Sequence, residues 1–540
     1  MRAPYSRNLF DLLCEQAERL PDNVALIAGD QCITYRQLET RVRRIAAGLQ
    51  ALGIARGDRV GVLLSNRAEW VEICIAASAL GSVTVPLSTW SKRGELDFLL
   101  ADSNIRVLFA LGSFGTQDYA ADLAALIPGL GTEAPEQWRA ERYPLLESVV
   151  VIDAGDALPG ALPYEQFGVT QLPFNAPPPG EGADSRGDAV LLYTSGSTSW
   201  PKAVRLTQGD MIENGFNIGE RQGYTERDKV LLGLPLFWSY GSANAMCATL
   251  THGATLVLQP RFEAGEALDL IERHGCTAIY TLPAATTALV SHPSFRPERT
   301  RSLRTGLTIG SPQDIETAAT VLGAREICNV YGQTETYGNC CVTWHHAPLD
   351  ERKERQGPPL PGAQLRIVDE HTGKEVGLGQ PGQIEVRGRV TPGYAGRSEA
   401  LNADLLTADG YLRTGDLGRL TEDGSLQFIG RNTEMIKRAG INVSPAEVEE
   451  LLRQHKGVAL AGAAGVPDGG RGEAIVAFVV PMPGVALSSD ELRAHCRALA
   501  SSYKSPDRIE ICESLPSTPT GKVLRKELKS MAEALMKDKQ

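Results

Sequence analysis

Long apolar runs, Cys-x-x-Cys pairs and an excess of positive charge are all absent from this chain of 540 residues. Its longest apolar stretch, residues 73–87, is interrupted by serine, glycine and proline and is too short to cross a bilayer. The net charge is −11, and an acidic surface repels the phosphate backbone of nucleic acids. We therefore expect neither a membrane span nor a nucleic-acid partner.

The ten cysteines are scattered and show no spacing typical of a metal site. Free thiols are typical of a reducing compartment. The first twenty residues mix acidic and basic side chains and contain no apolar core of a secretory signal. These features favour a cytoplasmic protein.

The composition is that of a globular protein, with 42% hydrophobic and 22% charged residues, and the length indicates several subdomains. Along the first two-thirds, strand and helix patterns alternate. Thr34-x-x-Gln37 is a capping box, and apolar residues at helical spacing follow it. This alternation predicts parallel sheets covered by helices, in an α/β fold. Further predicted strands are 60–64, 83–85, 190–193, 231–236, 254–258 and 278–282, and further predicted helices are 67–80, 242–250 and 266–274.

The pattern changes after Gly430 to a compact α+β unit, with a strand at 474–480 and helices at 488–500 and 523–536. We expect a large N-terminal domain of stacked α/β sheets (1–430), a hinge (431–433) and a small mobile C-terminal α+β domain (434–540). The proline-rich run 173–188 is predicted to be a surface connection.

The most informative segment is Tyr193-Thr-Ser-Gly-Ser-Thr-Ser-Trp-Pro-Lys202, which follows a buried strand. Small residues allow backbone N–H groups to approach phosphate oxygens, hydroxyls donate further hydrogen bonds, and a lysine adds a positive charge. The order differs from that of a Walker A loop. A serine-rich surface turn is the alternative interpretation of this segment alone.

The segment resembles the signature loop of the adenylate-forming superfamily, which comprises acyl- and aryl-CoA synthetases, peptide-synthetase adenylation domains and beetle luciferases. Ser199 and Ala203 stand where glycine is usual. The resemblance extends over nearly the whole chain. It implies that the loop binds ATP through Thr194, Ser195, Gly196, Ser197, Thr198 and Lys202. It also implies that Thr194 lies near the metal ion.

Asn329-Val-Tyr-Gly-Gln-Thr-Glu335 resembles the adenine and magnesium motif of that superfamily. The resemblance implies that Tyr331 stacks on adenine beside Gly332, and that Asn329 bonds the adenine amino edge. It also implies that Thr334 lies near the α-phosphate and that Glu335 holds Mg²⁺, for which a carboxylate oxygen is a suitable ligand. A solvated loop acid is the alternative for Glu335.

Three further motifs agree in order and spacing. The loop at Gly310-Ser311 resembles the wall of the adenine and acyl pockets. Tyr411-Leu-Arg-Thr-Gly-Asp416 resembles the ribose motif, in which Asp416 accepts hydrogen bonds from the ribose hydroxyls, and Arg431 is implied to reach ribose or phosphate. The tail around Lys522 resembles the catalytic lysine motif, and this lysine would neutralise charge at the reacting phosphorus.

In this superfamily the C-terminal domain rotates between two half-reactions. The resemblance places the hinge at Thr433, where Asp or Lys is usual, and places Gly440 near the thiol channel. Rotation requires accessible backbone angles more than one particular side chain.

Leu234-Pro-Leu-Phe-Trp238-Ser-Tyr-Gly241 resembles the acyl-pocket stretch, which implies acyl contacts by Trp238, Ser239, Gly241 and Gly310. Trp238 replaces the histidine frequent in CoA ligases; a packed core tryptophan is the alternative. Relatives that activate amino acids place an aspartate where this chain has Ser239. The absence of that carboxylate disfavours an α-amino acid and favours a fatty, aryl or bulky cyclic acid.

The resemblance therefore implies an acid–thiol ligase that uses ATP and Mg²⁺, forms acyl-AMP and passes the acyl group to coenzyme A. Free-standing loading of a carrier-protein phosphopantetheine stays open, as do a luciferase-type oxygenase and a degenerate protein that binds ligand without turnover. The oligomeric state, including a dimer, is also left open.

Overall fold

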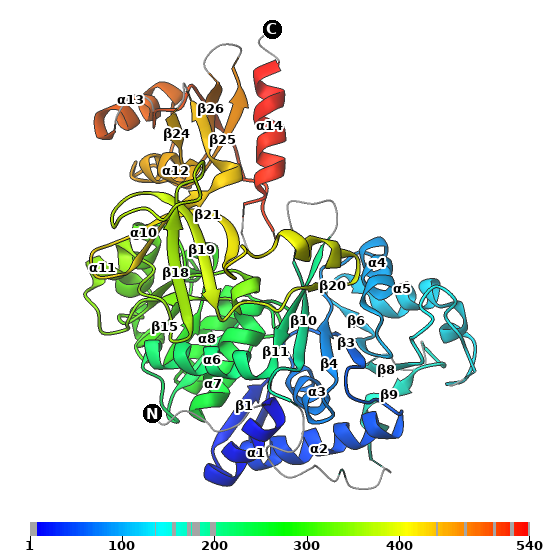
Figure 1. The fold of residues 1–540 in the computed structure, drawn as a ribbon. Helices are drawn as coiled ribbons and strands as arrows, with labels where there is room; N and C mark the ends of the chain where they lie inside the picture. Colours follow the sequence, from blue (N-terminus) through cyan, green and yellow to red (C-terminus); the bar gives the residue numbers. More distant parts are fainter. Residues whose placement is uncertain are drawn as a thin grey trace.

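The computed structural model describes residues 8–135, 137–153, 158–169, 174, 184–194, 201–438, 441–468, 472–500, 504–518 and 523–537. The predicted connection at 173–188 falls largely outside these residues. Within them the chain forms a large N-terminal α/β domain and a small C-terminal domain that lies against one end of it (Figure 1). No helix of the described residues has the length and apolarity needed to cross a membrane.

The first large sheet has a parallel centre and an antiparallel edge. Its strands lie in the order β20 (Tyr394–Ala395), β11 (Lys202–Thr207), β10 (Asp188–Thr194), β4 (Val83–Pro86), β3 (Arg59–Leu63), β5 (Val107–Leu111), β8 (Ser148–Ile152) and β9 (Leu162–Pro163). Pairing is parallel from β10 to β9, whereas β11 runs antiparallel to both of its neighbours.

The second large sheet is parallel except at its two edges. Its strands lie in the order β17 (Cys341–Val342), β16 (Cys328–Tyr331), β15 (Thr305–Thr308), β14 (Ala278–Tyr280), β12 (Lys229–Leu232), β13 (Thr255–Leu258), β1 (Val24–Ala28) and β2 (Gln31–Thr34). The predicted parallel sheets are thus present, because each strand–helix alternation returns the chain in the same direction.

Helices cover the faces of both sheets (Figure 1). They are α1 (Leu9–Arg19), α2 (Tyr35–Ala51), α3 (Ala68–Ala79), α4 (Arg93–Ser103), α5 (Tyr119–Leu126), α6 (Gln208–Gln222), α7 (Cys247–His252), α8 (Ala264–His274), α9 (Pro283–Val290), α10 (Pro312–Glu316) and α11 (Leu349–Glu354). The predicted capping box starts α2: the Gln37 amide donates to Thr34 Oγ1 at 3.3 Å and the Thr34 amide donates to Gln37 Oε1 at 2.9 Å.

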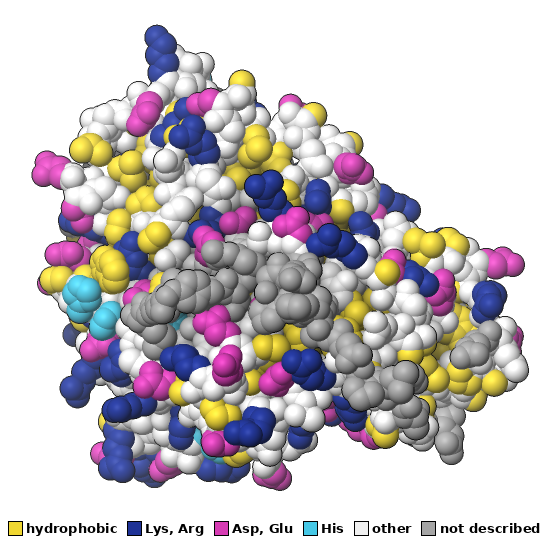
Figure 2. All heavy atoms as spheres, turned by 60° about the horizontal axis from the view of Figure 1, so that its bottom comes forward, with side chains coloured by type: hydrophobic (Ala, Val, Ile, Leu, Met, Phe, Trp, Pro, Cys, Tyr) yellow, Lys and Arg dark blue, Asp and Glu magenta, His cyan; other side chains and the backbone are white. Residues whose placement is uncertain are grey.

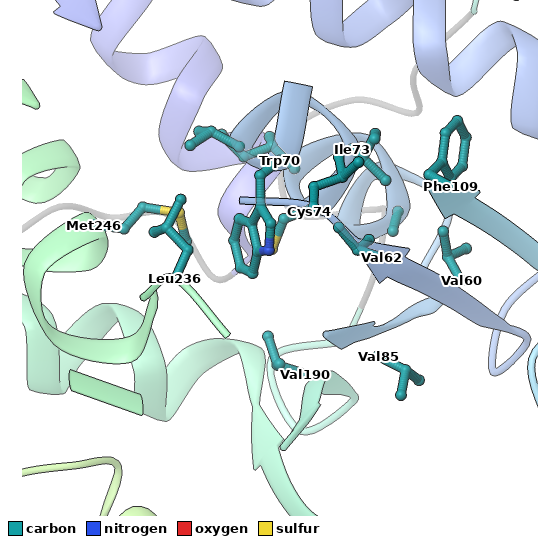
Figure 3. Close-up of a cluster of buried hydrophobic side chains, with 14 of the residues drawn as sticks. Val60, Val62, Trp70, Ile73, Cys74, Val85, Phe109, Val190, Leu236 and Met246 are labelled. Carbon is teal, nitrogen blue, oxygen red and sulfur yellow. The ribbon is translucent and has the colours of Figure 1, made fainter. Parts of the chain in front are cut away.

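One continuous core joins the two large sheets. Trp70 of α3 lies in it, among side chains that include Leu236, Met246 and Val190 (Figure 3). Almost every residue of α3 is buried, as expected for a helix packed on all sides. This packing holds the strand ends of the two sheets in a constant relation to each other.

The structure differs from the sequence predictions in several details. The strand predicted at 231–236 ends at Leu232, since the side chain of Asn66 takes over its hydrogen bonds: Asn66 Nδ2 donates to Leu234 O at 2.8 Å and the Leu236 amide donates to Asn66 Oδ1 at 2.8 Å. The helix predicted at 242–250 begins earlier, with a π-helical turn η4 (Tyr240–Met246) that continues into α7. Strand β11 was not predicted.

A third, antiparallel sheet lies between the large sheets and the C-terminal domain (Figure 1). It contains β18 (Ala363–Val368), β19 (Gly382–Gly388), β21 (Leu412–Leu420) and β22 (Leu426–Arg431). The C-terminal domain has its own apolar clusters, separate from the main core. It contains β23 (Ile436–Arg438), β24 (Ile441–Val443), α12 (Pro445–Arg453), β25 (Val458–Pro467), β26 (Glu473–Pro481), α13 (Ser489–Leu499), β27 (Arg508–Ile511) and α14 (Arg525–Lys537).

The surface carries both signs of charge. Figure 2 shows Lys and Arg side chains as well as Asp and Glu side chains over one face of the molecule.

Candidate active site

The carboxyl ends of parallel strands from both large sheets hold the residues singled out in the sequence. Strand β10 ends at Thr194, β16 ends at Tyr331, and Gly310 follows β15. The acyl-pocket stretch with Trp238 follows β12. Ligands of open α/β sheets bind outside such strand ends, so the fold gathers these motifs where a ligand is expected.

The segment predicted to bind phosphate connects β10 to β11. Thr194 pairs with Lys202 in this antiparallel register, so the two ends of the segment lie side by side. Lys202 Nζ lies 5.4 Å from the centroid of the Tyr394 ring. Several predicted site residues lie outside the described residues: Ser195, Gly196, Ser197, Thr198, Gly440 and Lys522.

Glu335 is buried in the 3₁₀ turn η7 (Thr334–Thr336), directly after β16. Its Oε1 accepts a hydrogen bond of 2.9 Å from the Tyr394 hydroxyl, and its backbone oxygen accepts one of 2.7 Å from the Thr391 amide. Burial and the Glu335 carboxylate raise the pKa of Tyr394, so its hydroxyl remains a donor. The side chain of Glu335 is therefore held in one orientation.

This arrangement fits Mg²⁺. The described residues contain no group of three or more His, Cys, Asp or Glu able to enclose a metal. Mg²⁺, however, is usually bound by one or two carboxylates together with phosphate oxygens and water. Glu335 Oε2 accepts no hydrogen bond from the described residues, which leaves it available to a cation bound beside a phosphate.

Asp416 on β21 has the features of a hydroxyl acceptor. The residue is 4% exposed, and its Oδ2 accepts a hydrogen bond of 2.8 Å from the Tyr331 hydroxyl. Its Oδ1 is buried and lies 3.3 Å from Arg431 Nε, but no described residue donates a hydrogen bond to it. Burial raises the pKa of the Asp416 carboxyl, and Arg431 offsets part of this effect. An unused buried acceptor beside an arginine fits a ribose hydroxyl.

Tyr331 and Asn329 lie on the same strand with different surroundings. The Tyr331 ring stacks against Phe428 with centroids 5.7 Å apart, and its hydroxyl contacts Asp416. Asn329 is buried, and its Nδ2 donates to Arg352 O at 3.0 Å, which leaves one amide hydrogen for another partner. The roles predicted for both residues toward adenine stay predictions.

Two glycines of the predicted site allow close backbone approaches. A Cβ on Gly332 would lie 2.4 Å from Gly338 O, and one on Gly241 would lie 2.2 Å from Pro235 O. Both distances are too short for any side chain, so these positions require glycine because of packing.

The loop Gly310–Ser311 leads into α10. The Ser311 side chain accepts from the Asp314 amide and the Asp314 side chain accepts from the Ser311 amide at 2.9 Å, which forms a capping box. This box holds the predicted pocket wall firmly at the start of the helix.

The acyl-pocket stretch meets the nucleotide motif at a pair of hydroxyls. Ser239 Oγ lies 3.3 Å from Thr334 Oγ1. One residue before Ser239 in the chain, the Trp238 ring contacts the Trp90 ring edge to face, with centroids 5.2 Å apart, and Trp90 contacts Phe237 in the same way at 5.1 Å. Three aromatic side chains thus contact one another, and two of them, Phe237 and Trp238, directly precede Ser239 in the chain.

No motif in the sequence singles out Tyr394 or Trp90. Tyr394 lies in a two-residue strand that shows no periodicity, and Trp90 follows β4 in a segment without a motif. The only available signal for Trp90 was its place just after a buried parallel strand, where site residues are common. The backbone of the predicted hinge residue Thr433 lies in the 3₁₀ turn η9 (Asn432–Glu434), between β22 and β23.

Comparison with known proteins shows the family of this chain. The family model "AMP-binding enzyme" matches residues 13–395, and "AMP-binding enzyme C-terminal domain" matches residues 447–522. The chain is 33% identical to a feruloyl-CoA synthase from Amycolatopsis sp, covering 95% of this chain and 97% of that protein. It is 30% identical to the mitochondrial medium-chain acyl-CoA ligase ACSF2 from Mus musculus, covering 96% of this chain and 87% of that protein.

Among solved structures, the chain resembles the anthranilate CoA ligase AuaEII in complex with anthranoyl-AMP. The TM-score is 0.85 at 26% identity, and the match covers 99% of this chain and 100% of that one. Such ligases use ATP, Mg²⁺ and coenzyme A. The chain therefore belongs to the AMP-binding enzyme family, in its acyl-CoA synthetase branch, and is an AMP-forming acid–thiol ligase.

Proposed function

We propose that this ligase activates an apolar carboxylic acid, aryl or aliphatic, that carries no α-ammonium group. The contact between the hydroxyls of Ser239 and Thr334 carries this proposal. In the proposed complex, the substrate carboxylate approaches the α-phosphate at this contact. Ser239 has no charge to bind an ammonium, and burying an unpaired ammonium is costly.

The aromatic wall supports an apolar acyl group. Trp90, Phe237 and Trp238 form edge-to-face contacts with one another, and Phe237 and Trp238 directly precede Ser239 in the chain. Ring edges and faces attract aryl groups and exclude water from aliphatic ones. The feruloyl-CoA synthase and the medium-chain acyl-CoA ligase among the relatives are consistent with an acid of this kind.

In the first half-reaction each side chain has a separate proposed role. Asp416 accepts hydrogen bonds from the ribose, Arg431 lies beside it, Lys202 binds phosphate, and Glu335 holds Mg²⁺, which neutralises phosphate charge when bound. Thr334 contacts the reacting carboxylate and Lys522 bridges that carboxylate and the α-phosphate, which stabilises charge as the phosphorus is attacked.

In the second half-reaction a thiolate attacks the acyl carbon and AMP leaves. Adenylation makes this possible because it turns a poor electrophile into a good one. We further propose that 1–430 and 434–540 move as two domains about a hinge at 431–433, with Thr433 as the pivot and Gly440 beside the thiol channel. Free coenzyme A is the proposed acceptor.

A matched substrate pair tests the proposal. Pyrophosphate release is measured with 3-phenylpropanoate and with phenylalanine, which differ by the α-amino group alone, in the presence of ATP and Mg²⁺, with and without coenzyme A. Medium-chain fatty acids and hydroxycinnamates complete the panel, and products are identified by mass spectrometry. We expect acyl-CoA from acids without an amino group. Preference for phenylalanine would contradict the proposed acid class, and acyl-AMP that persists with coenzyme A would indicate a carrier protein as acceptor.

A further inference from the structure

We propose that Tyr394 is a positioning residue for adenylation, which sets the phosphate lysine Lys202 and the magnesium carboxylate Glu335 relative to each other. This inference rests on the function proposed above for Lys202 and Glu335. Neither the family match nor any motif in the sequence analysis assigns a role to Tyr394.

The first observation is that one tyrosine contacts both charged groups through different parts of its ring. The Tyr394 hydroxyl donates to Glu335 Oε1 at 2.9 Å. The Lys202 ammonium lies 5.4 Å from the centroid of the same ring, within the range of a cation–π interaction. Lys202 and Glu335 thus share one rigid, uncharged spacer with only two side-chain torsions.

The second observation is that Tyr394 itself is tightly held. Its amide donates to Asn402 Oδ1 at 2.7 Å, and its carbonyl accepts from Asn402 Nδ2 at 3.0 Å. In β20 it pairs with Val204 of β11, the strand that begins at Lys202. The Tyr394 side chain is nearly fully buried.

The third observation is that the same segment also holds the backbone of Glu335. The Thr391 amide donates to Glu335 O at 2.7 Å, while Thr391 Oγ1 donates to Arg205 O of β11 at 2.6 Å. Residues 391–394 therefore connect the strand of Lys202 to the turn of Glu335 at several points. Glu335 would hold Mg²⁺ and Lys202 would bind the ATP phosphates, and two groups that act on one ligand need such a constant separation.

A purely structural tyrosine of the same kind exists in the chain and serves as the control. The Tyr164 hydroxyl donates to Glu72 Oε2 at 2.7 Å, and Arg44 Cζ lies 5.4 Å from the centroid of its ring. Both side chains of the Tyr164–Glu72 pair are buried. Glu72 belongs to α3 and Arg44 to α2, in helices far from the C-terminal domain (Figure 1).

The test measures ATP binding by titration calorimetry, in excess Mg²⁺ and in EDTA, without acid or coenzyme A. The ratio of the two affinities is the gain that the metal provides. Tyr394→Phe removes the hydroxyl but keeps the ring under Lys202, so we expect this gain to fall roughly tenfold, the size of one hydrogen bond to a charged group, with affinity in EDTA unchanged. Tyr394→Leu removes both contacts and is expected to lower the affinity in EDTA as well, by about threefold.

The control Tyr164→Phe is expected to change neither affinity, even where it lowers the melting temperature. If Tyr394→Phe lowers the ATP affinity equally in Mg²⁺ and in EDTA, the tyrosine has a general packing role and the proposal is overturned. An unchanged ratio of the two affinities overturns it as well. The variant Glu335→Gln distinguishes a failure of the proposed metal role of Glu335 from a failure of the positioning role of Tyr394. If Glu335→Gln lowers the affinity gained from Mg²⁺ and Tyr394→Phe does not, only the proposed role of Tyr394 is wrong. If Glu335→Gln leaves this gain unchanged, the proposed function of Glu335 is wrong, and so is the role of Tyr394 that depends on it.

Discussion

Arg453 of α12 forms a two-point ion pair with Asp314 of α10, with Nη2 2.6 Å from Oδ1 and Nη1 3.0 Å from Oδ2. Arg453 Nη1 also lies 3.3 Å from Ser311 Oγ. The C-terminal domain is thereby tied to the loop that begins at Gly310, which is predicted to wall the ligand pockets. The Asp314 carboxylate accepts hydrogen bonds both from the Ser311 amide at the start of α10 and from Arg453. A change at one of these contacts therefore affects the other.

We expect Arg453→Met to change the two half-reactions unequally, because under the proposed domain rotation this ion pair would exist in only one of the two arrangements. Adenylation is measured as pyrophosphate exchange, and thioesterification is measured from preformed acyl-AMP. Breaking a partly buried ion pair costs a few kcal/mol, so the ratio of the two rates should shift by about fivefold or more. Lys504→Met, which removes an ion pair with Glu447 inside the C-terminal domain, is the control. Equal changes in both rates would contradict the expectation.

We expect Asp416→Asn to change the stability of the fold and the affinity for ATP in opposite directions. Burial raises the pKa of Asp416, so the folded state disfavours its charged form at neutral pH. Asparagine has nearly the same shape without that charge. We expect a higher melting temperature at pH 7 without nucleotide, and at least a roughly tenfold weaker affinity for ATP because an ionic acceptor is lost.

The sign of the pH dependence follows from the raised pKa. Between the unfolded pKa and the higher folded pKa, the folded state binds more protons, so Asp416 lowers stability as pH rises through this window. The difference in melting temperature between Asp416→Asn and the parent should therefore become smaller as the pH falls through the pKa of Asp416 in the folded state. Thermal unfolding across this range measures it. A variant less stable than the parent at pH 7 would show that the interaction with Arg431 outweighs burial.

Ser239→Asp should reduce adenylation of 3-phenylpropanoate by about a hundredfold. The new carboxylate would lie near Thr334, where the substrate carboxylate is expected, and like charges a few ångströms apart repel strongly in a partly buried site. Ser239→Ala, which removes the hydroxyl without adding charge, should lose far less. The measured quantity is kcat/KM for pyrophosphate release. Equal losses in the two variants would argue against a carboxylate at this place.

Lys522→Ala should lower adenylation by orders of magnitude while the fold survives. The reason is the loss of a positive charge where negative charge develops on the attacked phosphorus. Single-turnover formation of acyl-AMP is the measurement, and circular dichroism checks the fold. Unchanged pyrophosphate release would rule out the proposed role. Lys526→Ala, in the exposed first turn of α14, provides a neighbouring lysine as control.

Much of the fold could be predicted because its signals are local. The capping box at Thr34, the buried strand near Val60 and the helix ending at His274 each depend on residues within a few positions. Strand β11 could not be predicted in this way, because it forms by pairing with β10 and with a two-residue strand far along the chain.

The order of residues along the chain was enough to indicate the chemistry: a phosphate loop before Lys202, an acid after a buried strand at Glu335, and Asp416 before Arg431. Each of these motifs lies in one short segment, so its residues can be recognised from their immediate neighbours in the chain. Tertiary packing alone decided that Tyr394 holds Glu335 across 59 positions and that Arg453 reaches Asp314 across 139. Such pairs arise where separate sheets and helices are packed together, and no local propensity or periodicity encodes which side chains then meet.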